Sequence, residues 1–211
     1  MTAGVFFLIT EVTAIAGLAL YQPVLADPNH PGSDTGVLLG GLLELLLVAA
    51  VIGSAVTLYP IVKRQNPGLA LGYVCARLLE AAIICVGTIS VLSIVTLREQ
   101  GMDNAVGKVL LAFHEWAFLL GPNFVLGANS LMLAALMYRS GLVPRAIAVL
   151  GLIGGPLICV SATAVLFGRY EQVSTVGALA ALPVFAWEVS LALYLIIKGF
   201  KPSAPMATQP H

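Results

Sequence analysis

Ionisable side chains inside long apolar segments are the features of this sequence that could do chemistry. Arg77 and Glu80 stand three residues apart in the apolar stretch 70–97, so a helix places both on one face, close enough to pair. Glu188 lies in the middle of the last apolar segment, at a depth that we expect to match this pair. One guanidinium can hold two carboxylates through its five N–H donors. We therefore predict that Arg77, Glu80 and Glu188 meet in one buried polar centre.

Two asparagines in the long apolar segment 106–138 are further candidates for this centre. Amide side chains inside a membrane commonly hydrogen-bond to neighbouring helices. The predicted polar centre or ligand-binding site therefore consists of Arg77, Glu80, Glu188, Asn123 and Asn129.

Four more ionisable residues are secondary candidates: Glu11, Glu44, His114 and Glu115. A tilted helix could bring either of the first two to water, and the last two precede Trp116, a residue type that favours membrane interfaces. The five glutamates within these segments outnumber the one arginine and one histidine, so they cannot all form ion pairs. Because burial favours the neutral carboxyl, some of these glutamates should be protonated or hydrated.

Most familiar catalytic patterns are absent from the sequence. One histidine within the apolar segments cannot supply bis-histidine haem ligation or a three-histidine zinc site, and no Gly-x-Ser-x-Gly, Walker or GxGxxG motif occurs. Cys75, Cys85 and Cys159 have no metal-ligand spacing, and we predict that they are buried small hydrophobic residues. The sequence therefore predicts no metal and no cofactor.

Two classes of function remain, with a purely structural role as a third. The first is binding, transport or sensing of a proton, cation, amphiphile or small molecule through the carboxylate-lined centre. The second is an intramembrane enzyme with Glu80 or Glu188 as general base and His114 as acid. We favour the first class, because protonatable groups without a nucleophile or metal set suit ligand or proton handling.

The composition is that of a polytopic membrane protein. The 211 residues are 59% hydrophobic and 9% charged, with a mean hydropathy of +0.99, whereas soluble domains carry about 25% charged residues. The net charge is zero and there is no run of one sign, which argues against a nucleic-acid partner. The expected partners are membrane lipids and a small-molecule or lipid ligand, and the oligomeric state is left open.

The apolar segments predict an all-α bundle of six transmembrane helices in one domain, residues 1–200. Each segment is long enough to cross a hydrocarbon core of about 30 Å at 1.5 Å per residue. The predicted spans are 4–21, 36–61, 69–97, 106–138, 144–167 and 177–200, followed by a disordered cytoplasmic tail, 201–211.

The fourth segment, 106–138, is too long for a straight span and too short for two. We predict one helix bent near Gly121 and Pro122, because proline removes a helical hydrogen bond. Gly141 is predicted to end this helix and Pro144 to start the next one.

The distribution of basic residues predicts the orientation. With six spans, one side holds Lys63, Arg64, Arg139, Arg145, Lys198 and Lys201, and the other holds Arg98, Lys108 and Arg169. Because cytoplasmic loops carry an excess of Lys and Arg, we expect both termini in the cytoplasm of a multi-pass cell-membrane protein.

Four runs of sequence resemble a bacterial membrane family known as domain of unknown function 4386. They are LYPIVKRQNPGLAL (58–71), RLLE (77–80), FHEWAFLLG (113–121) and YRSGLVPR (138–145). The likeness covers nearly the whole chain and implies a six-helix protein of the bacterial inner membrane. It implies no activity, cofactor or partner.

Overall fold

The computed structural model describes residues 1–30 and 34–201. Its helices are α1 (Thr2–Ala26), α2 (Asp34–Val62), α3 (Pro67–Glu99), α4 (Asn104–Leu119), the π-helical η1 (Leu120–Val125), α5 (Leu126–Ser140), α6 (Arg145–Leu166) and α7 (Thr175–Ile197). The described part of the chain contains no strand. The predicted all-α fold is confirmed; the predicted tail, apart from Lys201, lies outside the described residues.

Six helices are long and apolar enough to cross a membrane, which makes the chain a multi-pass integral membrane protein. Each predicted span corresponds to one of them, although the ends differ by a few residues. The largest difference is in α1, which continues past Pro23 to Ala26. Proline removes one hydrogen bond but does not have to end a helix whose neighbours pack against it.

Local sequence accounts for several helix ends. The side chain of Asn66 accepts a hydrogen bond from the Leu69 amide at 2.9 Å, and Pro67 occupies the first turn of α3. At the end of α5, Gly141 adopts a left-handed conformation with φ of 64°, as its predicted role as a helix stop requires.

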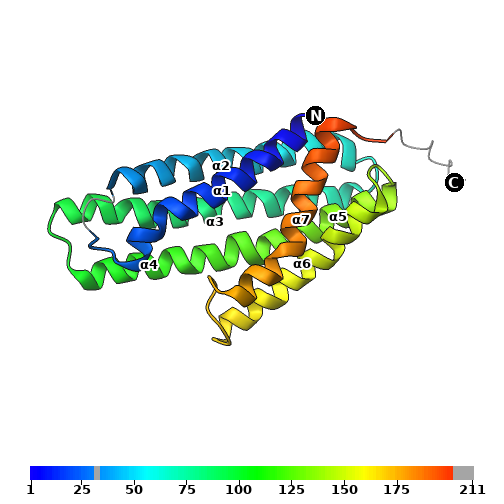
Figure 1. Cartoon of the computed structure of the whole chain (residues 1–211). Helices are drawn as coiled ribbons and strands as arrows, with labels where there is room; N and C mark the ends of the chain where they lie inside the picture. The colour runs from blue at the N-terminus through cyan, green and yellow to red at the C-terminus, as the bar shows by residue number, and fades with distance from the viewer. Residues whose placement is uncertain (31–33, 202–211) are drawn as a thin grey trace, which may run out of the picture.

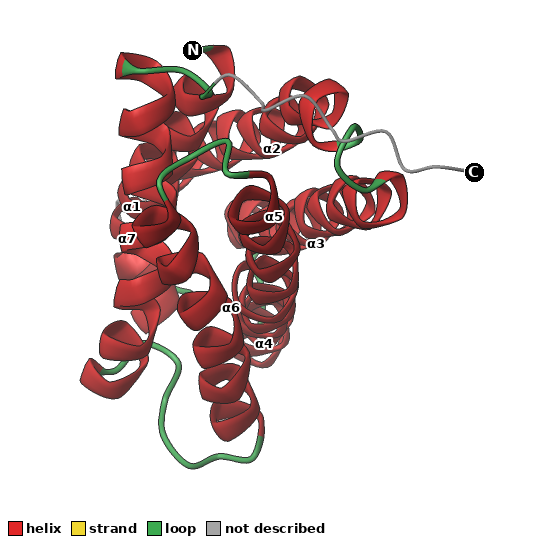
Figure 2. Ribbon diagram, turned by 90° about the vertical axis from the view of Figure 1, so that its right-hand side faces the viewer, coloured by secondary structure: helices red, strands yellow, loops and turns green. Residues whose placement is uncertain are grey.

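The helices form a bundle in which the N-terminus and the end of α7 lie at the same end (Figure 1). In this bundle, α1 packs between α2 and α7, α3 packs against α2, α4, η1 and α5, and α6 packs between α5 and α7. Seen along the bundle from its right-hand end in Figure 1, α1 and α7 form one wall, and α5 lies between α6 and α3 (Figure 2). The interior is therefore bordered by every membrane-spanning helix.

Glycines allow the closest helix contacts. A Cβ built on Gly127 of α5 would lie 2.7 Å from the carbonyl oxygen of Gly155 on α6. A Cβ on Gly154 would lie 2.5 Å from the backbone nitrogen of Val184 on α7. Such close backbone approach supplies packing where lipid provides no hydrophobic drive between helices.

The prediction that the cysteines are buried is wrong. Cys75 is exposed, and Cys85 and Cys159 are half-buried. The outer surface of the bundle is itself apolar, with residues such as Ile15 and Ile89 exposed by 60% and 64%. A small hydrophobic side chain is as stable against lipid tails as inside the protein, so its position is not fixed by hydropathy.

The fourth span is one continuous helix of 37 residues, Asn104–Ser140, as predicted. The irregular turn falls at Gly121 and Pro122 and takes the form of the π-helix η1. Pro122 cannot donate to the carbonyl of Phe118, four residues earlier. The side-chain amide of Asn123 donates to that carbonyl instead, at 2.9 Å.

Candidate functional site

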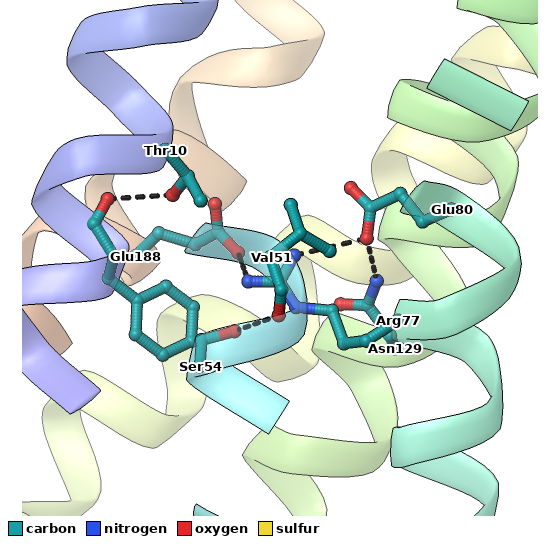
Figure 3. A network of polar contacts seen from close by, with 8 residues as sticks. Thr10, Val51, Ser54, Arg77, Glu80, Asn129 and Glu188 are labelled. Atoms are coloured by element: carbon teal, nitrogen blue, oxygen red, sulfur yellow. Dashed lines mark hydrogen bonds and ion pairs between the residues drawn. The ribbon is translucent and has the colours of Figure 1, made fainter. Parts of the chain in front are cut away.

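Arg77 lies at the centre of the bundle, with only 1% of its surface exposed. Its Nη1 atom lies 3.0 Å from Oε2 of Glu80 on the same helix, and Nη2 lies 3.6 Å from Oε1 of Glu188 on α7. The guanidinium also stands over the ring of Phe7, 5.1 Å from its centroid. The predicted contact among Arg77, Glu80 and Glu188 is therefore present, and it joins α3 to α7 across the bundle (Figure 3).

Glu80 receives a second hydrogen bond from a third helix. The Nδ2 atom of Asn129 on α5 donates to Oε2 of Glu80 at 2.6 Å, so one oxygen accepts from both Arg77 and Asn129. This asparagine is 1% exposed and makes the interhelical bond that the sequence predicted. Asn123 does not reach the centre, because its amide is used within its own helix.

Glu11 of α1 lies next to Glu188 in the same centre. The two side chains are within hydrogen-bonding reach of each other, and Glu11 also interacts electrostatically with Arg77 and Glu80. Adjacent carboxyl groups are stable together only when a proton or another cation reduces their repulsion. Arg77 already faces Glu80 and Glu188, so the Glu11–Glu188 pair needs a further positive charge.

These groups line one cavity of about 130 Å³. Within the described part of the chain, four carboxyl groups, one guanidinium and one imidazole face it: Glu11, Glu44, Glu80, Glu188, Arg77 and His114. The rest of the wall is mostly apolar, with residues such as Leu47, Ile84 and Phe118. The space thus combines an apolar body with an excess of acidic groups.

A second group of polar contacts lies further along the cavity wall. Oε2 of Glu44 on α2 accepts a hydrogen bond from Thr88 at 2.5 Å and another from the Tyr21 hydroxyl at 3.4 Å. The ring of His114 meets that of Tyr21 edge-on, with centroids 5.8 Å apart. Glu44 and His114 therefore face the protein interior and not the membrane interface.

Glu115 does not line this cavity, and its side chain is exposed. Tyr21 and Thr88 contact Glu44, and neither residue was predicted from the sequence. Hydroxyl residues inside apolar helices usually bond to the carbonyl of the preceding turn, as Thr88 also does to Ile84 at 2.9 Å. Their sequence positions alone therefore gave no signal of a shared partner.

Chemically, the cavity can hold protons or a small cation, and its apolar wall can hold a hydrocarbon body. An apolar cavity of about 150 Å³ binds benzene, so a space of this size suits a ligand of about six heavy atoms. Among the described residues, no three His, Cys, Asp or Glu side chains are arranged to hold a metal ion.

Comparison with known proteins relates the chain to a family only. No curated protein and no solved structure matches it. A family model described as a domain of unknown function (DUF4386) matches residues 2–199, nearly the whole chain and all six membrane-spanning helices. The chain therefore belongs to the DUF4386 family of domains of unknown function.

Proposed function

We propose that this protein binds a small organic cation, such as a short-chain amine, in the cavity around Arg77, as the ligand step of transport or sensing. The observation that carries the proposal is the set of four carboxyl groups facing one guanidinium among the described residues of the cavity wall. A bound ammonium group would supply the charge that the Glu11–Glu188 pair lacks, and the apolar wall would contact its hydrocarbon chain.

Protons are the simplest alternative occupant within the same class. A carboxyl that carries a proton needs no ligand, so protonation alone could also relieve the repulsion between Glu11 and Glu188. The apolar wall favours a molecule over a proton, because a site for protons alone has no use for a cavity of about 130 Å³.

Calorimetric titration of the purified protein in detergent tests the proposal. The probe is n-butylammonium, with n-butanol and butyrate as neutral and anionic controls of nearly equal size. We expect n-butylammonium to bind most tightly, n-butanol less tightly and butyrate most weakly, because the cavity carries excess carboxyl groups. Equal affinities for the three probes, or no binding of any of them, would reject an organic-cation site.

Variants make the test specific to this cavity. A charge-assisted hydrogen bond contributes about 1.5–3 kcal/mol, so Glu11→Gln should weaken butylammonium binding about tenfold or more. Glu99→Gln, at the exposed end of α3, is the matched control and should bind as the wild type does.

An intramembrane enzyme is the second candidate, because His114 faces the same cavity as Glu80 and Glu188. In that case His114 would act as general acid and a glutamate as general base. His114→Gln should then abolish turnover of a bound ligand while leaving its binding intact.

We also propose that both termini are cytoplasmic and that the protein resides in the bacterial inner membrane, with lipids as its immediate partners. The support is the excess of Lys and Arg at the end of the bundle that holds the termini.

A further inference from the structure

A second and larger cavity, of about 610 Å³, lies beside the first. It is bordered by α1, by α4 and by the turn that joins α6 to α7, and we call it the outer cavity. Its lining residues include Leu25, Glu115, Trp116, Tyr170, Glu171 and Val173. In Figure 1 the connected ends of α6 and α7 lie apart from the α3–α4 connection, and both are remote from the N-terminus and from the end of α7 that leads to Lys201.

The two cavities share three wall residues: Leu18, His114 and Phe118. The rings of His114 and Phe118 are stacked, with centroids 6.4 Å apart and planes only 7° from parallel. His114 is 6% exposed, so its ring is covered even though both cavities reach it. The partition between the cavities is thus made of the side chains of these three residues.

The wall on the α7 side of the outer cavity is held in place by a local hydrogen bond. The hydroxyl of Tyr170 lies 2.7 Å from the hydroxyl of Ser161 on α6, which ties the turn to the helix before it.

The charged residues that line the outer cavity are acidic. Arg169, in the same turn, lines a separate recess with Phe167. Among the described residues, the outer cavity is therefore lined by two acidic side chains, Glu115 and Glu171, and by no Lys or Arg.

We infer that the outer cavity is the access route to the site: a cation enters at the end of the bundle opposite the termini and passes Leu18, His114 and Phe118 to reach the inner carboxyl groups. This inference rests on the proposed function for the identity of the ligand. An acidic cleft with low-dielectric walls raises the local concentration of cations, so the route selects charge before the ligand reaches the site.

Cysteine labelling in membrane vesicles tests the route without requiring a ligand. Cys75, Cys85 and Cys159 are first replaced by alanine, and single cysteines are then introduced. Val173→Cys reports access to the outer cavity, and Ala14→Cys reports access to the cavity around Arg77, which we call the inner cavity. Gln65→Cys reports access from the opposite end of the bundle. The probes are a trimethylammonium and a sulfonate methanethiosulfonate, applied to right-side-out and to inverted vesicles.

We expect Ala14→Cys to react from the same side as Val173→Cys, and Gln65→Cys from the other side. The cationic reagent should label Ala14→Cys about tenfold or more faster than the anionic one, after correction for their intrinsic rates. Leu18→Trp should slow labelling at position 14 and leave position 173 unchanged. Ala117→Cys, on the inner wall of α4, repeats the measurement if the first variant folds poorly.

Two results would overturn the route: labelling of position 14 from the side of Gln65, or a rate that Leu18→Trp does not change. These results are independent of the ligand test. Correct labelling without butylammonium binding would reject the proposed function alone, whereas butylammonium binding with labelling from the wrong side would reject the route alone.

Discussion

At the scale of single residues, Arg77 determines how the interior of the bundle can be occupied. It is the one Arg or Lys side chain on the inner cavity wall in the described part of the chain, and it contacts Glu80 and Glu188 on two different helices. A buried ion pair is not in itself strongly stabilising, but removal of one partner leaves an uncompensated charge. The residues around Arg77 should therefore respond to mutation as a group.

Arg77→Ala should destabilise the protein more than Glu80→Ala or Glu188→Ala. It leaves two carboxyl groups without the positive charge that both face, and breaking a buried ion pair typically costs about 3–5 kcal/mol. Thermal unfolding in detergent measures the loss, with Arg64→Ala, at the exposed α2–α3 turn, as a control that should change little. The variant that carries all three substitutions, Arg77→Ala, Glu80→Ala and Glu188→Ala, completes the test. If the stability losses of the three single variants add up to the loss of this triple variant, the residues do not act together.

The sequence predicted the members of this cluster because charge inside an apolar segment is rare and costly. Arg77, Glu80 and Glu188 could be paired by counting depth along each helix. Glu11 and Glu44 remained ambiguous, because depth alone does not tell whether a side chain faces protein or water. Their position depends on helix rotation and tilt, which are set by packing between helices that are distant in sequence.

At the scale of helices, the π-helical turn η1 shows how a proline is accommodated in the fourth span. The loss of the backbone hydrogen bond from position 122 to the Phe118 carbonyl could be predicted from the sequence, because proline has no N–H. The form of the irregularity could not, because it depends on which group replaces the missing donor. Here the neighbouring amide of Asn123 does so, which also explains why this asparagine is absent from the polar centre.

Asn123→Ala should cost about 1–3 kcal/mol, the usual penalty for an unsatisfied buried polar group. In a Pro122→Ala background the backbone N–H at position 122 can serve the Phe118 carbonyl, so the same substitution should cost much less. A double-mutant cycle by thermal unfolding measures the difference. Equal costs in the two backgrounds would mean that the amide has another role.

Gly154→Ala tests the close packing of α6 on α7. The added methyl group meets the backbone of Pro183 and Val184, which cannot move like a side chain, so we expect a loss of about 1–3 kcal/mol. Gly36→Ala is the matched control, since the nearest atom to its Cβ would be 3.7 Å away. It should be neutral or stabilising by up to about 1 kcal/mol, as alanine is the better helix former. An equal loss at both positions would contradict the packing argument.

At the scale of the whole molecule, hydropathy was sufficient to predict six spans, because a long apolar segment can satisfy its own backbone hydrogen bonds in lipid only as a helix. It did not predict the order of helices around the interior, nor the two cavities. The helix order and the cavities depend on two features of the packing. Helix α1 packs against α7, and the connected ends of α6 and α7 diverge from α4. The sequence therefore predicted the elements and the central contact, and the structure supplies the space around them.

The orientation is tested by reporter insertion at the α2–α3 turn after Gln65 and at the α6–α7 turn after Gly168. The first should report the cytoplasm together with a fusion at the C-terminus, and the second should report the opposite side. If both reporters lay on the same side of the membrane, the six-span topology would be wrong. If the reporter after Gly168 lay in the cytoplasm and the one after Gln65 outside, the topology would hold and only the orientation would be reversed.

The most direct test of an organic-cation site around Arg77 is an experimental structure of the purified protein with n-butylammonium. We predict density for one molecule in the inner cavity, with its nitrogen within hydrogen-bonding distance of the carboxyl groups of Glu11 and Glu188 and its carbon chain against Leu47 and Ile84. An inner cavity closed by side chains, or butylammonium bound only at the outer surface of the protein, would contradict an organic-cation site.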